Sequence, residues 1–291
     1  MPLFTLASSP GAIADEYESA RTSLARAGAR ATVFDASVYD PAAVARLCLM
    51  LRIRTASEYH SASVFQRLAT QLMQAHATLD AQAVMTRMAF DELRHAELCA
   101  RALVAVGAPA ECEIADHIPD LTDHPEVSRE EAALRNVIYS CAMTEAINTA
   151  RFVHTLDRTT DPYLHEVLRQ LLADEVQHGA FGFHYVERWA PWLQQNPEVR
   201  ASLEGFMRHA FFMLEWAMSG GKRPHVALTP DERALGLPDP LTLGDVFYQT
   251  VESAIVPGLE RCGIAAERAY RTRVSPLRCL LSSFRPSGAP A

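Results

Sequence analysis

The sequence predicts an all-α fold: a four-helix bundle with one long crossover connection and additional helices before and after it. Apolar residues recur at helical spacing in four long segments between residues 41 and 190, which is the pattern of helices that bury one face. Residues 107–127, between the second and third segments, contain three prolines and no periodicity. A connection of that length is too long for a helical hairpin and long enough to cross a bundle.

Each helix of the bundle begins at a recognisable signal. Asp-Pro pairs at 40–41 and 161–162 open the first and fourth helices, because Asp can cap a helix and Pro is tolerated at its first position. Asp80 can cap the second helix, and a capping box at 128–131 opens the third. The expected helices run from Pro41 to about Gln74, from Asp80 to Gly107, from Ser128 to the turn at 158–161, and from Pro162 to Pro191, which should close the last one.

The rest of the chain is arranged around this bundle. Beyond residue 190 the pattern stays helical, and Pro257 should kink or split a helix over 243–262. The expected regions are 1–40, with one helix over 11–28 that packs on the bundle; 41–190, the bundle itself; 191–273, accessory helices; and 274–291, a poorly ordered tail.

Composition excludes several classes of protein. The 291 residues are 49% hydrophobic, so the chain can bury a large core. The net charge is −8 with no basic run, which argues against nucleic acid as the main partner. No apolar run approaches the roughly 18 residues of a membrane span, and the first residues lack a basic segment, so we expect no membrane partner and a cytoplasmic protein. The six cysteines lack Cys-x-x-Cys spacing, which favours buried free thiols over disulfides or zinc.

Two short strings carry the chemistry of this sequence. Glu92-Leu-Arg-His95 and Glu175-Val-Gln-His178 are its only Glu-x-x-His strings. Residues three apart lie on one face of a helix, so a carboxylate and an imidazole from each string can bind one metal ion. Either string alone is more often a solvated helix face. A metal site is therefore predicted only if other parts of the sequence supply further ligands at the same height in the bundle.

Two further glutamates make that case. Glu58 precedes Glu92 by 34 residues and Glu145 precedes Glu175 by 30, with a probable turn near each midpoint. In an antiparallel hairpin, residues equidistant from the turn lie at the same height. Each lone glutamate also interrupts an apolar stripe, where a carboxylate is costly unless paired or bound to metal; a rim position is the alternative. The six predicted metal ligands are Glu58, Glu92, His95, Glu145, Glu175 and His178, the set of a di-iron helix bundle.

With these residues the sequence resembles the ferritin-like non-haem di-iron carboxylate proteins over about 41–190. The Asp-Glu-x-Arg-His form of residues 91–95 resembles that of bacterial multicomponent monooxygenases and acyl-carrier-protein desaturases. The resemblance implies a ferritin-like bundle in which the six residues bind iron. It also implies that Asp91 and Asp174 each accept a hydrogen bond from a ligand histidine on the facing motif.

The resemblance also implies a catalytic role for Thr149, because the monooxygenases place a threonine near the oxygen pocket four residues after this glutamate. A threonine that bonds to its own helix backbone is the alternative. Leu171 occupies the position of an extra histidine in the arylamine N-oxygenases, which counts against that branch. Gly179 and Gly182 leave room beside the metals for substrate or oxygen, or serve close helix packing.

Oxygen-rich ligation with two imidazoles suits iron or manganese rather than structural zinc. We expect two Fe ions, with Mn/Fe as the alternative, O₂ as cosubstrate, and an external electron donor such as a reductase or ferredoxin. The expected reaction is hydroxylation, desaturation or N-oxidation of a small hydrophobic or aromatic molecule, and the expected assembly is a homodimer. The expected substrate pocket is lined by Leu51, Phe65, Met88, Cys99, Ile138, Phe152 and Leu171.

Three other functions remain open from the sequence. The first is iron handling as in ferritins, although about a hundred residues after 190 are unlike a bare storage bundle. The second is a ligand-binding Mn/Fe oxidase that resembles the ribonucleotide reductase small subunit, with Tyr59 and Tyr139 as candidate radical sites away from the apolar seam. The third, a metal-free interaction module, is disfavoured because four buried carboxylates would repel one another.

Overall fold

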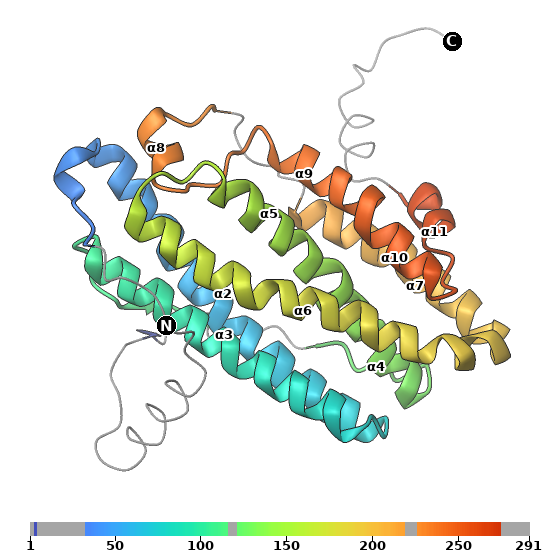
Figure 1. Ribbon diagram of the computed structural model, residues 1–291. Helices are drawn as coiled ribbons and strands as arrows, with labels where there is room; N and C mark the ends of the chain where they lie inside the picture. The colour runs from blue at the N-terminus through green and yellow to red at the C-terminus, as the bar shows by residue number, and fades with distance from the viewer. Residues whose placement is uncertain (1–2, 5–32, 116–120, 219–225, 275–291) are drawn as a thin grey trace, which may run out of the picture. The chain divides into compact units, whose positions relative to one another are not determined.

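The structure is a computed structural model that describes residues 3–4, 33–115, 121–218 and 226–274, and most of these residues are helical (Figure 1). The all-α prediction is confirmed. The expected helix over 11–28 and the tail beyond Val274 lie outside the described residues. The chain divides into two compact units, the first formed by Met1–Thr122, Thr155–Asp174 and Leu228–Leu237, the second by Asp123–His154, Glu175–Ala227 and Pro238–Ala291.

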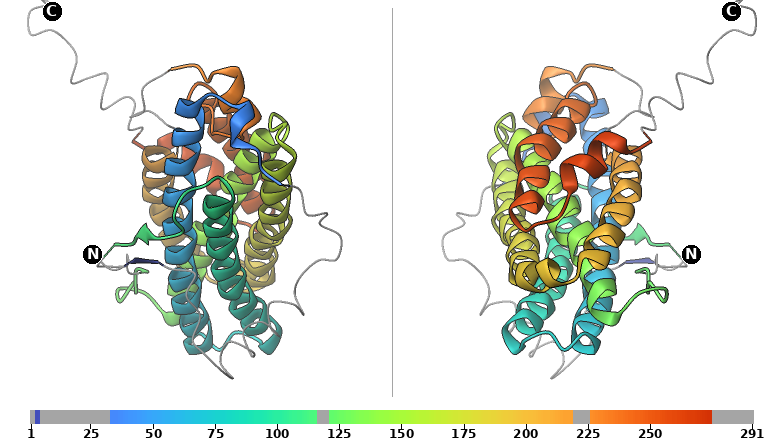
Figure 2. Two further views of the ribbon diagram at one scale, coloured as in Figure 1. Left: turned by 90° about the vertical axis from the view of Figure 1, so that its left-hand side faces the viewer. Right: turned by 90° about the vertical axis from the view of Figure 1, so that its right-hand side faces the viewer.

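The first unit is built on a helical hairpin. Its elements are β1 (Leu3–Phe4), the 3₁₀ turn η1 (Ala36–Val38), α2 (Pro41–Gln74), α3 (Leu79–Ala105), β2 (Cys112–Glu113), the beginning of α6 (Pro162–Gln195) and α8 (Pro230–Ala234). α2 and α3 lie side by side along most of their length (Figures 1 and 2). Their contact buries the predicted stripe of α2, which includes Leu47, Leu51, Phe65, Leu68 and Leu72.

Local capping explains where these helices begin. The Asp40 side chain accepts a hydrogen bond from Ala42 N at 2.7 Å, as the Asp-Pro signal predicts. Asp161 Oδ1 caps α6 in the same way, by accepting a hydrogen bond from Leu164 N at 2.8 Å. α3 begins one residue before its expected start, because Thr78 takes the N-cap position and Asp80 lies in the first turn, beside the positive end of the helix dipole.

The connection after α3 is not entirely irregular. Residues 112–113 form β2, which pairs antiparallel with β1. Arg52 of α2 donates a hydrogen bond to the Glu111 carbonyl at 2.6 Å, which ties the start of this connection to the hairpin. The predicted loop is therefore anchored, although it contains no helix among its described residues.

The second unit holds the remaining helices. They are α4 (Arg129–Val137), η2 (Ile138–Glu145), α5 (Ala146–Leu156), the rest of α6, α7 (Pro197–Met218), α9 (Leu243–Thr250), η3 (Val251–Ile255), α10 (Val256–Arg261) and α11 (Ala266–Thr272). α4, η2 and α5 follow one another without a break, so the predicted third helix exists, but η2 is π-helical. η3 is also π-helical, and it separates α9 from α10, whose second residue is Pro257.

The prediction that Pro191 closes the fourth helix is wrong. α6 continues through Pro191 to Gln195. A proline removes only one N–H from the helix ladder, and the turn after it is held by Leu193, which is fully buried. The helix ends where Asn196 Nδ2 donates to the Trp192 carbonyl at 2.7 Å.

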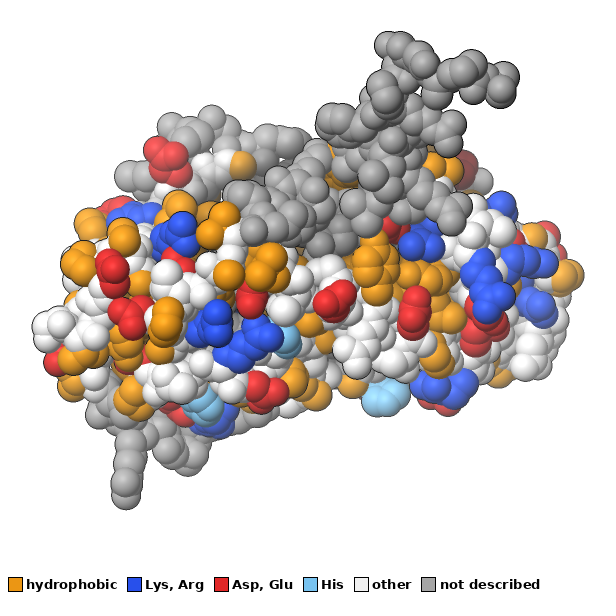
Figure 3. All heavy atoms as spheres, turned by 90° about the horizontal axis from the view of Figure 1, so that it is seen from above, with side chains coloured by type: hydrophobic (Ala, Val, Ile, Leu, Met, Phe, Trp, Pro, Cys, Tyr) orange, Lys and Arg blue, Asp and Glu red, His pale blue; other side chains and the backbone are white. Residues whose placement is uncertain are grey.

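The surface carries charge of both signs. Over the face drawn in Figure 3, acidic and basic side chains are interspersed with apolar ones. Among the described residues, no helix combines the length and the apolar character that a membrane crossing requires.

Candidate metal centre

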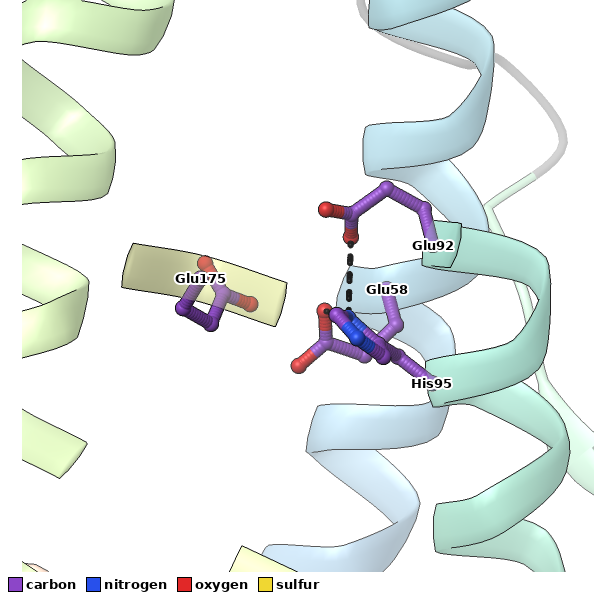
Figure 4. Close-up of side chains that lie close together, drawn as sticks. All are labelled: Glu58, Glu92, His95 and Glu175. Atoms are coloured by element: carbon purple, nitrogen blue, oxygen red, sulfur yellow. Dashed lines mark ion pairs between the residues drawn. The ribbon is translucent and has the colours of Figure 1, made fainter. Parts of the chain in front are cut away.

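Three predicted ligands meet in the first unit. Glu58 comes from the middle of α2, and Glu92 and His95 lie three residues apart on one face of α3. Their relative exposures are 8%, 1% and 2%. His95 Nδ1 lies 3.8 Å from Glu58 Oε2 and 3.8 Å from Glu92 Oε2, and Figure 4 shows the three side chains pointing toward one another. We call these residues the first cluster.

Two aspartates, each preceding a candidate ligand glutamate, lie beside this cluster. His95 Nε2 lies 3.4 Å from Asp174 Oδ2. Arg94 Nη1 lies 2.9 Å from Asp91 Oδ1 and 3.7 Å from Asp174 Oδ2, so one guanidinium connects the two aspartates. Asp91 also accepts hydrogen bonds from Arg87 Nε at 2.9 and 3.0 Å. A histidine that donates to a carboxylate through one ring nitrogen presents the other nitrogen to a metal.

Charge in the first cluster is finely balanced. Burial raises the pKa of the Glu58 carboxyl, although the adjacent His95 ring opposes the shift. Burial alone would lower the pKa of His95, but the nearby carboxylates of Asp174, Glu58 and Glu92 outweigh it and raise this pKa well above its ordinary value. Arg54 Nη1 also lies 3.9 Å from Glu58 Oε1. The Arg54 guanidinium and, when protonated, the His95 ring thus both lie beside the Glu58 carboxylate.

The other three predicted ligands meet in the second unit. Glu145 is the last residue of η2, and Glu175 and His178 lie three residues apart on α6. All three are buried, with exposures of 5%, 2% and 1%, and His178 Nδ1 lies 3.9 Å from Glu175 Oε2. We call them the second cluster. Glu175, which is also labelled in Figure 4, directly follows Asp174 on the continuous helix α6.

The π-helical segment η2 was not predicted from the sequence. The apolar spacing through Ile138, Cys141 and Glu145 fits an ordinary α-helix, so periodicity gave no signal of it. Thr144 Oγ1 donates to the Tyr139 carbonyl five residues earlier, at 2.9 Å, within the wider turn of the segment. Short π segments are frequent at functional sites, and this one ends at a candidate metal ligand.

The structure distinguishes between the two interpretations of the glycines after His178. A Cβ built on Gly182 would lie 2.3 Å from Ala142 N, so this glycine serves close packing of α6 against η2. A Cβ on Gly179 would lie 3.5 Å from Ala146 N, an ordinary contact. Gly182 therefore leaves no room for substrate on its η2 side.

Thr149 lies one turn after Glu145, on α5. Its Oγ1 is buried, and among the described residues it has no hydrogen-bond partner. The alternative in which this hydroxyl bonds to its own helix backbone is therefore not what the structure contains. An unpartnered buried hydroxyl costs free energy, which is consistent with a functional reason for its presence.

Some of the predicted pocket residues line a small apolar cavity in the first unit. It lies between α2, α3, the beginning of α6 and the end of α8, next to the first cluster through Arg54. Its lining residues are Met50, Leu51, Arg54, Cys99, Leu164, Val167, Leu168, Leu171, Leu235 and Gly236. Of the residues expected to line a substrate pocket, Leu51, Cys99 and Leu171 line this cavity. Phe65 and Met88 are buried elsewhere in this unit, and Ile138 and Phe152 are buried in the second unit.

The donor atoms fit metal ions. Each cluster offers two carboxylates and one imidazole, and within each cluster one ligand atom per residue lies within 4.8 Å of the others. Donors on opposite sides of one ion, with bonds of about 2.0–2.2 Å, are about 4.0–4.4 Å apart. Shifts of a few tenths of an ångström in flexible glutamates would close that difference. The oxygen-rich set suits iron or manganese.

Comparison with protein families gives the same assignment. Residues 50–182 match the rubrerythrin family model, and this range contains all six predicted ligands. The rubrerythrin model, which belongs to the ferritin-like di-iron carboxylate superfamily, covers this range of the chain. The family resemblance and the ferritin-like fold predicted from the sequence are confirmed. No curated protein and no solved structure matched the chain.

Proposed function

We propose that the two clusters form one di-iron centre, and that the protein uses it to oxidise a small apolar organic molecule with O₂. The observation that carries the proposal is the order of residues on α6. Asp174 contacts His95 of the first cluster, and the next residue, Glu175, belongs to the second. One continuous helix therefore contributes to the surroundings of both clusters, which supports a shared centre.

Two iron ions at this centre would supply the redox chemistry, and the chain would supply binding, orientation and exclusion of water. Asp174, supported by Arg94, fixes the ring of His95. Thr149 has a buried hydroxyl that can transfer a proton to a group at the second cluster. An external donor, a reductase or a ferredoxin, would return electrons to the centre. Manganese in one position is compatible with the same ligands.

The apolar cavity supports the substrate class. Its walls are aliphatic apart from Arg54 and Cys99, and burial raises the pKa of the Cys99 thiol to about 12, which keeps that thiol neutral. Leu171 contributes to the wall where the arylamine N-oxygenases carry a histidine. A hydrophobic or aromatic molecule that enters from this side would approach the first cluster past Arg54 and Leu51.

Both an oxygenase and an iron-handling protein oxidise Fe(II), so oxidation alone does not distinguish them. The test therefore measures whether the iron stays bound after it has been oxidised. Chain loaded anaerobically with Fe(II) should consume about one O₂ per pair of irons. It should then keep both as ferric ions and react again only after reduction. Continued turnover of excess Fe(II), with release of ferric product, would move the assignment to iron handling. A chain that binds no iron would overturn both.

A further inference from the structure

The helices that carry the second cluster come closest at Gly182. A Cβ built there would lie 2.3 Å from Ala142 N, 2.7 Å from Ala142 Cα and 2.7 Å from the Cys141 carbonyl carbon. All three are backbone atoms, so no side-chain rotation can relieve the overlap. Because interiors are close-packed, even one added methyl group would have to push α6 away from η2.

Other helical glycines of this unit lack that constraint. A Cβ on Gly179 would meet Ala146 N at 3.5 Å, and a Cβ on Gly205 would meet nothing within 4 Å. A Cβ on Gly258 would lie 2.5 Å from the Phe183 ring, which is the end of a side chain and can move. Gly182 therefore differs from these three in facing backbone at overlapping distance.

The close contact lies beside the candidate ligands on both helices. On η2, Ala142 precedes Glu145 by three residues, so it lies about one turn away. On α6, Gly182 follows His178 by four residues and Glu175 by seven, which places all three on one helix face. A change in helix separation at Gly182 is therefore transmitted directly to the distance between Glu145 and its two partners. Functional groups must be held within about 0.5 Å of their working geometry.

We propose that Gly182 is a positioning residue for the metal ion of the second cluster. Its missing side chain sets the separation of α6 and η2 at which Glu145, Glu175 and His178 can share one ion. The inference rests on the proposed metal centre, and it adds a residue that touches neither metal nor substrate.

The test uses the full chain with Co(II), whose absorption spectrum reports coordination geometry. Gly182→Ala should keep its far-UV helical signal and bind the second Co(II) more weakly, by about 10- to 100-fold, the usual effect of disturbing the support of a ligand. Its Co(II) absorption bands should also change. Gly179→Ala and Gly205→Ala should bind two Co(II) with the wild-type spectrum. Gly258→Ala, whose added Cβ would meet the movable Phe183 side chain and not the η2 backbone, controls for loss of stability without loss of metal.

Two results separate this inference from the proposed function. If wild type and Gly182→Ala both bind two Co(II) with the same affinity and spectrum, Gly182 is not a positioning residue and the metal centre stands. If wild type binds none, the metal centre itself is wrong. Should Gly182→Ala fail to fold, Gly179→Val is the second variant. Its larger side chain would push α6 away from the backbone at Glu145 and Ala146, about one turn before Gly182. Retention of two Co(II) by that folded variant would also overturn the inference, and loss of the second Co(II) would support it.

Discussion

His95 Nε2 lies 3.4 Å from Asp174 Oδ2, and this contact turns the other ring nitrogen, Nδ1, toward Glu58 and Glu92 at 3.8 Å each. One carboxylate on α6 thereby decides which atom of a histidine on α3 is offered to a metal. The residue that does so is the immediate neighbour of Glu175, so the orientation of the first cluster depends on the helix that carries the second.

Asp174→Asn tests this orientation. The amide keeps the size of the side chain but can present its NH₂ group to Nε2. The tautomer with the proton on Nε2 and an unprotonated Nδ1, which can bind a metal, is then no longer preferred. We expect metal affinity to fall by about 10- to 100-fold while the helical content stays unchanged. Isothermal titration with Co(II) measures the change. Asp157→Asn, at an exposed position, is the matched control, and an equal affinity in both variants would refute the role of Asp174.

Metal loading should depend on pH in a defined direction. The pKa of His95 is raised by the carboxylates around it, and burial raises the pKa of Glu58. Both groups therefore hold protons more tightly in the metal-free protein than they would in water, and a metal must displace those protons. Apparent Co(II) affinity should keep rising as the pH increases above the ordinary histidine pKa of about 6.5, with proton release in weakly buffered solution. A constant affinity without proton release would contradict this account.

The hydroxyl of Thr149 should contribute little to folding. Thr149→Val keeps the shape of the side chain and removes a buried, unpartnered Oγ1, so the free energy of unfolding should stay equal or rise by up to about 1 kcal/mol. Thr144→Val is the contrast, because Thr144 Oγ1 bonds to the Tyr139 carbonyl and its loss should be destabilising by about 1 kcal/mol. If Thr149 has the proposed role, its variant should also consume O₂ with less substrate oxidised per O₂. Unchanged coupling would remove Thr149 from the mechanism.

Much of this fold could be predicted because its signals are local. Asp40 caps α2 and Asp161 caps α6 where the Asp-Pro pairs lie, and both contacts involve residues two or three positions away. The ligand stripes followed from helical periodicity alone, since each ligand interrupts an apolar face that must be buried. Glu58 and Glu92 were matched by counting from the turn between their helices, which requires no knowledge of the remaining chain.

The features that were missed depend on distant parts of the chain. η2 becomes π-helical where α6 approaches it at Gly182, and no local pattern in 138–145 encodes that approach. α6 continues beyond Pro191, and we attribute this to the burial of Leu193 in the turn that follows, which is a tertiary effect. The cavity includes Leu235 and Gly236, from a segment far along the chain whose position could not be inferred from spacing.

Breaking a buried ion network in the second unit should strongly destabilise that unit. Arg135 on α4 donates to Glu131 Oε1 at 2.8 and 3.1 Å and to Ser202 Oγ on α7 at 2.8 Å, and its guanidinium lies 5.4 Å from the Phe206 ring centre. Arg135→Met leaves the buried Glu131 carboxylate without a positively charged partner, although Ser202 Oγ still donates a hydrogen bond to it, so the free energy of unfolding should fall by about 3–5 kcal/mol.

Urea denaturation of the metal-free protein checks this value. Arg169→Met is the control, because Arg169 forms an ion pair with Glu166 near the surface and should change stability by less than about 1 kcal/mol. The double variant Glu131→Gln with Arg135→Met should recover part of the lost free energy of unfolding, since it also removes the buried negative charge of Glu131. Equal stabilities of the two single variants would show that the network is not a stabilising element.

The iron–iron separation tests most directly whether the two clusters form one centre. X-ray absorption of the protein loaded with two Fe(II) and oxidised should show an iron neighbour at about 3.5–4 Å or less. Glu92→Gln and Glu175→Gln should each abolish that signal, because each removes a carboxylate ligand from one cluster. Two irons bound without any iron–iron signal would contradict the account, since the clusters would then be separate mononuclear sites.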